Sequence, residues 1–282
     1  MRILLIGGSG TVGRAVRSAL EELSPVTVTQ RHEAENLSTY FNAEDDECPL
    51  RLDGFSSVVY VAGLTSLRAC EENWSRSERV NCLAPQKLAE RCSALGAPFV
   101  FVSSGAASRY DGLSIAEAMQ ANADGAPGAS TYGLHKFIAE RAILKCPTAA
   151  VVRLSKIAGP QWSLIDEWLT KLRSGKVVEA FCDHYLSPVM LEDAVSLLTR
   201  VIQMRETGPI AISALDELSY AEVARLLAEK VGQPSHLVAS VSASLLGDPR
   251  LFGCSARLDS RRAERLLGTS VRTTMEVIDR YL

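Results

Sequence analysis

The chain has 282 residues, of which 47% are hydrophobic and 22% are charged, and its net charge is −3. This composition is typical of a globular protein with a sizeable core, and the length suffices for one large α/β domain or for a nucleotide-binding domain with a smaller lobe. The slightly negative charge argues against a nucleic-acid or anionic-membrane partner, and no run approaches the roughly 18 apolar residues of a membrane-spanning helix.

The first half of the chain alternates short apolar runs with helical patterns. Uninterrupted, β-branched strands that alternate with helices predict a parallel sheet covered on both faces, which is a doubly wound α/β fold. The segment 32–57 contains an acidic stretch, and no strand can be placed in it firmly. The predicted strands are Ile3–Ile6, Val26–Thr29, Val58–Val61, Pro98–Val102 and Ala149–Leu154, and the predicted helices are Val12–Leu23, Arg76–Leu95 and Tyr132–Leu144.

The pattern changes after Leu154, where Gly159-Pro160 interrupts the alternation. Further helices are predicted at Leu164–Leu172, from Ser187 to about Met204, at Ser219–Val231 with Ser219 as its cap, and at Thr274–Tyr281, with a strand at Ile210–Ser213. We therefore expect two interleaved parts. Residues 1–155 and 187–212 would form a dinucleotide-binding domain, and residues 156–186 and 213–282 a smaller α/β substrate lobe.

A glycine-rich loop, Gly7-Gly8-Ser9-Gly10-Thr11-Val12-Gly13, follows the first predicted strand and begins a helix. Glycines permit the tight turn, let backbone N–H groups approach a pyrophosphate, and let the helix lie close to the sheet. The helix N-terminus adds partial positive charge. A glycine triplet by itself is equally compatible with a structural turn, but its place in a strand–turn–helix favours a dinucleotide cofactor.

The end of the second strand indicates which cofactor is preferred. An acidic residue there would bind the ribose 2′-hydroxyl of NAD, whereas this chain has Gln30-Arg31-His32. The Arg31 guanidinium suits a 2′-phosphate, so NADP(H) is favoured and NAD(H) remains an alternative, as does a solvated surface arginine. Ala62-Gly63-Leu64 ends a further strand with small residues where a cofactor would lie, although packing alone would also explain them.

Tyr132 and Lys136 lie four residues apart, which places a phenol and an ammonium on one helix face. A free phenol has a pKa of about 10, and a neighbouring cation would lower that pKa toward the working range of a proton donor. Lys136 would also bind the ribose of a nicotinamide cofactor. His135 points to another face of the helix and is expected to be structural.

A serine pair, Ser103-Ser104, ends the buried strand 28 residues before Tyr132. Ligands of open α/β sheets bind at the carboxyl ends of the strands, so a serine hydroxyl there can orient a carbonyl and stabilise oxyanion charge. A turn or a helix cap is the structural alternative. The ordered set of glycine loop, serine, tyrosine and lysine favours a catalytic serine.

Seven dispersed cysteines, no CxxC pair and four histidines without ligand spacing predict neither a disulfide framework nor a metal site. Gly7-Gly8 ends the first apolar run before it reaches the length of a secretory signal. A reducing, cytoplasmic location is therefore expected.

Taken together, these motifs resemble the extended short-chain dehydrogenase/reductases, and most closely the dTDP-4-dehydrorhamnose reductase branch. The resemblance spans nearly the whole chain. It is carried by Met1–Gly13, Ala62–Ser66, Arg79-Val80-Asn81, Val102-Ser103-Ser104, Asp111-Gly112, Tyr132–Lys136, Val152–Pro160, Asp183–Pro188 and Ser255–Ser260.

The resemblance implies a Rossmann-type fold and an NADPH-dependent reduction of a ketone. By this analogy Ser104, rather than Ser103, would hold the carbonyl oxygen, Tyr132 would donate a proton, and Lys136 would tune Tyr132 and bind the ribose. Lys156 is expected to contact the substrate together with Ser104. Asn81 would support the helix or a proton-relay water, and helix packing alone is an equal alternative.

The chain departs from the branch after the serine pair. The family continues S-T-D-Y-V-F-D-G, whereas this chain has Ser103-Ser104-Gly105-Ala106-Ala107-Ser108-Arg109-Tyr110-Asp111-Gly112. The acid and the aromatic residue after the hydroxyl pair are replaced, and residues 114–129 lack the acidic, proline-rich approach to the tyrosine. Both differences lie where the substrate is expected.

The leading hypothesis is a ketoreductase acting on a nucleotide-linked 4-keto sugar or a similar bulky ketone. A cofactor-retaining epimerase or dehydratase is an alternative, and stoichiometric NADPH consumption would distinguish the two. A non-catalytic NADP-binding regulatory subunit is a third hypothesis, against which the presence of Ser104, Tyr132 and Lys136 argues. The sequence is also compatible with a homodimer.

Overall fold

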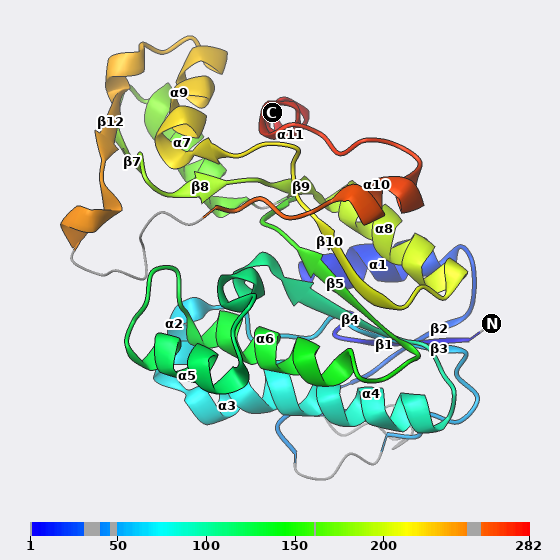
Figure 1. Ribbon diagram of the computed structural model, residues 1–282. Coiled ribbons are helices and arrows are strands. Elements are labelled where there is room, and N and C mark those ends of the chain that lie inside the picture. Colours follow the sequence, from blue (N-terminus) through cyan, green and yellow to red (C-terminus); the bar gives the residue numbers. More distant parts are fainter. Residues whose placement is uncertain (1, 31–39, 46–49, 161, 247–254) are drawn as a thin grey trace.

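The structure is a computed structural model that describes residues 2–30, 40–45, 50–160, 162–246 and 255–282. A six-stranded, wholly parallel sheet lies at its centre in the order β10-β5-β4-β3-β1-β2 (Figure 1). The chain moves outward from β1 to β2 and then crosses to the other side of β1, so the strand order reverses between β1 and β3. The strands are β1 (Ile3–Ile6), β2 (Val26–Val28), β3 (Ser57–Tyr60), β4 (Phe99–Ser104), β5 (Ala149–Leu154) and β10 (Gly208–Ile212).

This sheet confirms the predicted doubly wound α/β fold, and the predicted strands lie within a few residues of the observed ones. In the described part of the segment 32–57, which gave no firm strand from sequence, Tyr40 forms an isolated parallel bridge with Gln30.

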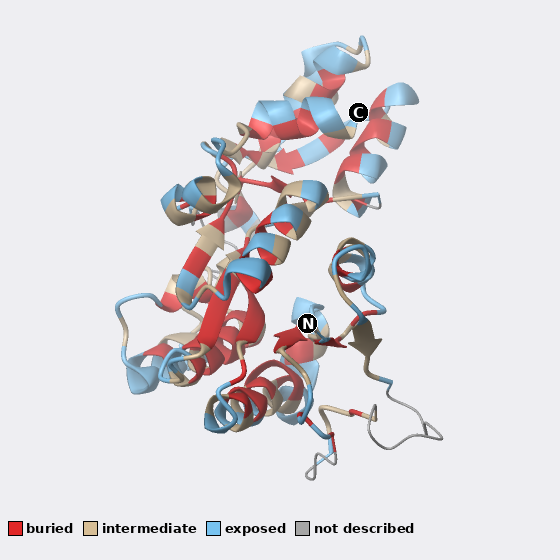
Figure 2. Ribbon diagram, turned by 90° about the vertical axis from the view of Figure 1, so that its right-hand side faces the viewer, coloured by how far each residue is buried: buried red, intermediate tan, exposed pale blue. Residues whose placement is uncertain are grey.

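Alternate residues of each strand supply the two faces of the sheet. Ile3 and Leu5 pack with helices α1 (Thr11–Glu21), α8 (Leu191–Met204) and α10 (Arg261–Leu267). Leu4 and Ile6 pack with α4 (Ala84–Ala94) and α6 (Thr131–Ile143) on the opposite face. The helices are buried toward the sheet and exposed on their outer sides (Figure 2). The inner strands β1, β3, β4 and β5 are almost wholly buried, whereas the edge strands β2 and β10 are only partly buried.

The helix predicted at Arg76–Leu95 is interrupted. It consists of α3 (Trp74–Glu78), a π-helical turn η1 (Arg79–Leu83) and α4. The Ala84 N–H bonds to the Arg79 carbonyl five residues earlier, and Pro85, which follows, has no amide hydrogen to continue an α-helical pattern. The predicted range is therefore helical from Arg76 to Ala94, and only the π-helical turn within it was not predicted.

The segment between β4 and α6 folds onto α6. It forms a 3₁₀ helix η2 (Gly105–Tyr110) and the helix α5 (Ile115–Ala123), which begins with a capping box between Ser114 and Glu117. Ala107 and Tyr110 of η2 pack against Leu134 and Phe137 of α6 in a small core of their own. A short helix α2 (Leu67–Glu72) follows β3 and also contacts α6.

The remaining elements form a second layered unit around a separate core (Figure 1). The helix expected from Ser187 begins only at Leu191, because Val189–Met190 forms strand β9, paired with β6. The helix at Ser219 has the predicted cap. The elements of this unit are β6 (Ile157–Ala158), α7 (Ser163–Arg173), β7 (Val178–Phe181), β8 (Tyr185–Leu186), β9 (Val189–Met190), β11 (Leu218–Ser219), α9 (Tyr220–Lys230), η3 (Ser235–Leu237), β12 (Val238–Val241), η4 (Ala243–Leu246) and α11 (Thr274–Tyr281).

The proposed division into 1–155 with 187–212 and 156–186 with 213–282 remains a prediction. Helix α10, which belongs to the second set of residues, contacts α8 and β10 and contributes Ala263 to the core of the central sheet. The chain therefore contributes one more helix, α10, to the central sheet after it has formed most of the second unit.

Candidate active site

The glycine loop occupies the carboxyl end of β1, where the strand order reverses. Gly7 has a φ of +94°, and a Cβ there would lie 2.4 Å from the Ala62 backbone nitrogen. A Cβ on Gly13 would lie 2.1 Å from the Gly7 carbonyl oxygen, so neither position tolerates a side chain. These two glycines are required by the close packing of the loop, the strand and the helix α1.

Gly10 differs, because a Cβ there would meet only the Gly7 carbonyl oxygen, at 3.8 Å. It is the N-cap of α1, which has no side-chain cap and no acidic residue in its first turn. The N-terminal N–H groups of α1 are therefore left open beside Ser9, Thr11 and Val12, and an anion would be stabilised there. This cradle fits a pyrophosphate. Arg31, which was expected to select the cofactor, lies outside the described residues.

The loop after β3 lies next to the glycine loop and is held by Asn81. The Leu64 N–H donates to Asn81 Oδ1 at 3.1 Å, and Asn81 Nδ2 donates to the Leu64 carbonyl at 3.0 Å. A Cβ on Gly63 would lie 3.2 Å from Asn81 Oδ1 and 3.8 Å from Lys136 Nζ. Ala62, Gly63 and Leu64 thus connect the glycine loop to the lysine of α6, and Asn81 supports this loop.

Ser104 and Tyr132 come together at the carboxyl end of β4. Ser104 accepts a hydrogen bond from the Ala106 N–H at 3.2 Å and acts as a hydrogen-bonding neighbour of the Tyr132 phenol. Ser103 points to the other face of the strand and is buried. The structure therefore pairs Ser104, and not Ser103, with Tyr132.

The start of α6 lies close to η2, because a Cβ on Gly133 would be only 2.6 Å from the Ala106 carbonyl oxygen. Ser130 caps the helix by accepting from the Gly133 N–H at 3.1 Å. The Ser130 N–H in turn donates to the Tyr110 hydroxyl at 2.9 Å. The position of Tyr132 is thus fixed by the backbone around it.

Lys136 is buried one turn after Tyr132. Its Nζ donates to the Val102 carbonyl at 3.0 Å and lies 4.4 Å from the centre of the Phe101 ring. Burial lowers the pKa of Lys136 to about 8, and the negative charge of Glu140 opposes this decrease.

The prediction that Lys136 lowers the pKa of Tyr132 was wrong. Burial raises the pKa of Tyr132 to about 12, and the hydrogen bond with Ser104 only partly opposes the rise. The physical reason is that Tyr132 lies against the protein interior, while the Lys136 ammonium is directed to the Val102 carbonyl. Tyr132 is therefore protonated at neutral pH, which is the form that a proton donor requires.

His135 lies on another face of α6, among side chains of α3. Its Nδ1 is 2.9 Å from the Ser77 hydroxyl, and its ring packs edge-on against Trp74, with centroids 4.5 Å apart. Burial lowers the pKa of His135 to about 4, so the ring is neutral. These contacts are those of a packing residue, as the sequence suggested.

A cavity of about 620 Å³ opens beside Ser104, between the central sheet and the second unit. It has the size of a pocket for a small organic ligand. The carboxyl-terminal ends of β4 and β5 bring Ser104 and Lys156 to the same cavity, and its far wall includes aromatic rings. Among its lining residues are Ser104, Arg109, Lys156, His184, Tyr220 and Ala256.

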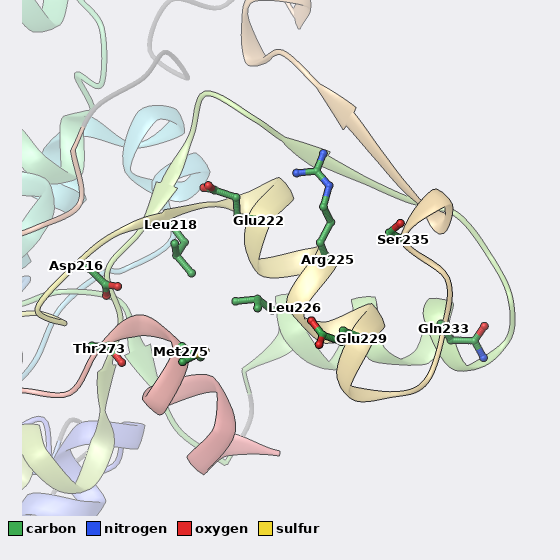
Figure 3. Close-up of a pocket in the computed structure, with 10 residues that line it drawn as sticks. All are labelled: Asp216, Leu218, Glu222, Arg225, Leu226, Glu229, Gln233, Ser235, Thr273 and Met275. Carbon is green, nitrogen blue, oxygen red and sulfur yellow. The ribbon is translucent and has the colours of Figure 1, made fainter.

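A second cavity, of about 710 Å³, lies between α9 and α11 (Figure 3). Leu218, Leu226 and Met275 surround it, and none of the predicted site residues lines it. Two of its polar groups are engaged in helix capping: Glu222 belongs to the capping box of α9, and Thr273 to that of α11. No tyrosine or lysine is among its lining residues, so this cavity lacks the serine, tyrosine and lysine set of the site at Ser104.

Two further observations bear on cofactors and location. Within the described ranges, no cluster of three or more histidine, cysteine, aspartate or glutamate side chains could hold a metal ion. No helix among the same residues has both the length and the apolar character needed to cross a membrane.

Two residues at this site were missed in the sequence. Tyr110 fixes Ser130 through its hydroxyl, and Glu71 binds Thr131 from α2. Neither pair has a local sequence signal, since the partners are 20 and 60 residues apart. Such contacts arise only from the tertiary fold.

Known structures of the same architecture are numerous. The chain is similar to a dTDP-4-dehydrorhamnose reductase from Yersinia enterocolitica, with a TM-score of 0.79, 19% identity, and coverage of 99% of this chain and 98% of that chain. The reductase from Bacillus anthracis, solved in complex with NADP, gives a TM-score of 0.74 at 16% identity, covering 99% and 98%.

A dTDP-glucose 4,6-dehydratase from Streptomyces venezuelae, solved with NAD and TYD bound, gives a TM-score of 0.70 at 20% identity, covering 100% of this chain and 95% of that chain. No curated protein matches the sequence. At these identities the structural neighbours establish the fold.

The family assignment comes from a family model. The model described as the RmlD substrate binding domain matches residues 1–282, the full length of the chain. The match confirms the resemblance that the glycine loop, Ser104 and Tyr132–Lys136 suggested, and the chain belongs to this family of extended short-chain dehydrogenase/reductases.

Proposed function

We propose that the chain is an NADP(H)-dependent ketoreductase that reduces the keto group of a nucleotide-linked 4-keto sugar or a similarly bulky ketone. The observation that carries the proposal is the placement of Ser104 and Tyr132, with the buried Lys136 one turn away, at the edge of the sheet where α1 presents an open N-terminus. The family match and the NADP complex of the Bacillus anthracis reductase support it.

The cofactor would be held by Gly7, Gly10 and Gly13 with the adjoining Ser9, Thr11 and Val12 at its pyrophosphate, and by Ala62, Gly63 and Leu64 along the neighbouring loop. Arg31 would bind the 2′-phosphate of NADP, and its replacement by an acidic residue would favour NAD. Tyr132 and Lys136 would bind the nicotinamide ribose. When bound, NADPH supplies the hydride for the carbonyl carbon.

The residues of this chain act on the carbonyl oxygen. Ser104 donates a hydrogen bond that orients the oxygen and stabilises the negative charge that develops on it. Tyr132 transfers its phenolic proton to the same oxygen, so that hydride and proton together convert the ketone to an alcohol. The positive charge of Lys136 stabilises the phenolate that remains. Lys156 would bind an anionic part of the substrate from the cavity wall.

The test is the oxidation of NADPH by the purified protein with a panel of nucleotide-linked keto sugars and unlinked ketones. One NADPH consumed per alcohol formed supports a reductase, whereas conversion without net consumption would show an epimerase or dehydratase. In Tyr132→Phe we expect kcat to fall by about 100-fold or more while NADPH still binds. Full activity in this variant would refute the proposed role of Tyr132.

A further inference from the structure

The carboxylate of Glu71 joins α2 to the first turn of α6. Its Oε1 accepts from the Thr131 N–H at 2.8 Å, and its Oε2 accepts from the Thr131 hydroxyl at 2.7 Å. Thr131 is buried and directly precedes Tyr132. Glu71 thus holds the backbone immediately before the proposed proton donor from an element 60 residues away.

This contact also suits the electrostatics of the helix start. The first N–H groups of a helix have no partners within the helix, and a carboxylate is stabilised beside their partial positive charge. Ser130 satisfies the Gly133 N–H from within the chain segment, while Glu71 satisfies the Thr131 N–H from outside it. Because Ser130 alone fixes the helix start only locally, Glu71 determines where this start lies relative to α2.

Helix α2 is itself tied to the loop that would lie along the cofactor. The Cys70 thiol donates to the Leu64 carbonyl at 3.3 Å, next to the pair of hydrogen bonds that Asn81 makes with Leu64. Glu71 follows Cys70 directly. A continuous chain of contacts therefore runs from Leu64 through α2 to Thr131 and Tyr132.

We infer that Glu71 is a positioning residue that fixes the position of Tyr132 relative to the loop Ala62–Leu64. This inference rests on the proposed reductase function. Both oxygens of Glu71 are engaged by Thr131, so Glu71 acts on the reaction through Thr131 and Tyr132. Glu71 also lines the cavity beside Ser104, and a direct contact with the substrate would appear as a rise in KM in place of a fall in kcat. Its loss would leave cofactor binding intact but misplace the phenol relative to the carbonyl oxygen. Small misplacements of a reacting group reduce the rate steeply.

The experiment compares Glu71→Ala and Glu71→Gln with wild type in the full-length protein. For Glu71→Ala we expect kcat to fall about 10- to 100-fold, with the Kd for NADPH changed less than about threefold. In Glu71→Gln the amide oxygen can still accept from the Thr131 N–H, and the amide NH₂ can donate to the Thr131 hydroxyl oxygen. This variant should therefore recover most of the rate.

Glu276→Ala is the matched control. Glu276 Oε2 accepts from the N–H and the hydroxyl of Thr273 at 2.7 and 2.9 Å, so Glu276 binds the same two donor groups at the start of α11, but within its own helix and away from the site. Its removal should leave kcat unchanged. Amide hydrogen exchange gives a readout independent of turnover: Glu71→Ala should accelerate exchange at residues 130–133 and leave residues 84–94 of α4 unchanged.

The outcomes separate the inference from the proposed function. If Glu71→Ala accelerates exchange at residues 130–133 but leaves kcat unchanged, Glu71 acts only as a helix cap. This result would overturn the inference and leave the proposed function intact. Unchanged exchange would show that the contact does not hold the helix start, and would also overturn it. A wild-type protein that binds NADPH but reduces no ketone of the panel would overturn the proposed function, and the inference with it.

Discussion

At the scale of single residues, the site contains a side chain that is buried although it can carry a charge. Lys136 is the clearest case, because its ammonium lies in the core with a backbone carbonyl and an aromatic ring as neighbours. Burial disfavours the charged form and therefore lowers the pKa of Lys136 to about 8, which reflects the free-energy cost of burying the ammonium. The protein keeps an unfavourable cation where the proposed chemistry needs one.

The lowered pKa of Lys136 can be tested through the pH dependence of protein stability. Because the folded pKa of Lys136 is below its ordinary value of 10.5, the unfolded chain binds more protons between pH 8 and 10.5. The free energy of unfolding of the wild type should therefore rise by about 3 kcal/mol from pH 8 to pH 10.5 relative to that of Lys136→Met, at roughly 1.4 kcal/mol per pH unit. Urea unfolding of both proteins at pH 7, 8, 9 and 10.5 measures the difference, and parallel pH profiles would contradict the assignment.

At the scale of elements, a partly buried ion cluster holds the segment after Ser104 against the sheet. Arg153 of β5 donates to both oxygens of Asp111, at 2.6 and 2.7 Å, and to Glu140 of α6, at 2.6 and 3.0 Å. Asp111 directly follows η2, and Glu140 lies one turn beyond Lys136. One guanidinium thus joins η2, α6 and β5, the three elements around the proposed proton donor.

Breaking this cluster should cost far more than breaking a surface pair. Arg153→Met leaves the Glu140 carboxylate buried without its partner, so we expect unfolding to be easier by about 3 kcal/mol or more. Arg261→Met removes only a solvent-exposed pair with Asp259 and should leave stability nearly unchanged. Chemical denaturation of both variants tests the contrast, and equal losses would show that the cluster contributes no more than a surface pair.

The elements also show what the sequence could predict. The strands of the sheet and the glycine loop follow from local patterns, and the predictions were close because strand–turn–helix units form between neighbouring residues. Helix α5 was missed, although Ser114 and Glu117 form a capping box that the sequence displays. By contrast, the contact of Glu71 with Thr131 and the cluster around Arg153 join distant segments, so no local pattern could indicate them.

At the scale of the whole molecule, the last part of the chain returns to the active-site edge of the sheet. Glu217 holds this return: its Oε2 accepts from the Ser255 hydroxyl at 2.8 Å, from the Ala256 N–H at 2.6 Å and from the Arg257 N–H at 3.1 Å. Ser255 and Ala256 line the cavity beside Ser104. The second unit thereby shapes the proposed substrate site.

Removing this support should affect substrate binding and cofactor binding differently. For Glu217→Ala we expect the KM of the keto substrate to rise about fivefold or more, because three hydrogen bonds to one charged group are lost. The Kd for NADPH should stay within about twofold of wild type. Asp259→Ala, which removes an exposed carboxylate paired with Arg261, is the control. A parallel rise of both constants in Glu217→Ala would show that the two sites are not separable in this way.

The π-helical turn at Arg79–Leu83 has a consequence for how the chain tolerates change in length. Such a turn holds one residue more than an α-helical turn, so α3 and α4 are out of phase by about 100°. Trp74 of α3 packs on His135, and Leu88 of α4 packs under the sheet. Deleting one residue here would make a regular helix that could satisfy only one of these contacts, whereas an equal deletion in a surface loop would be absorbed.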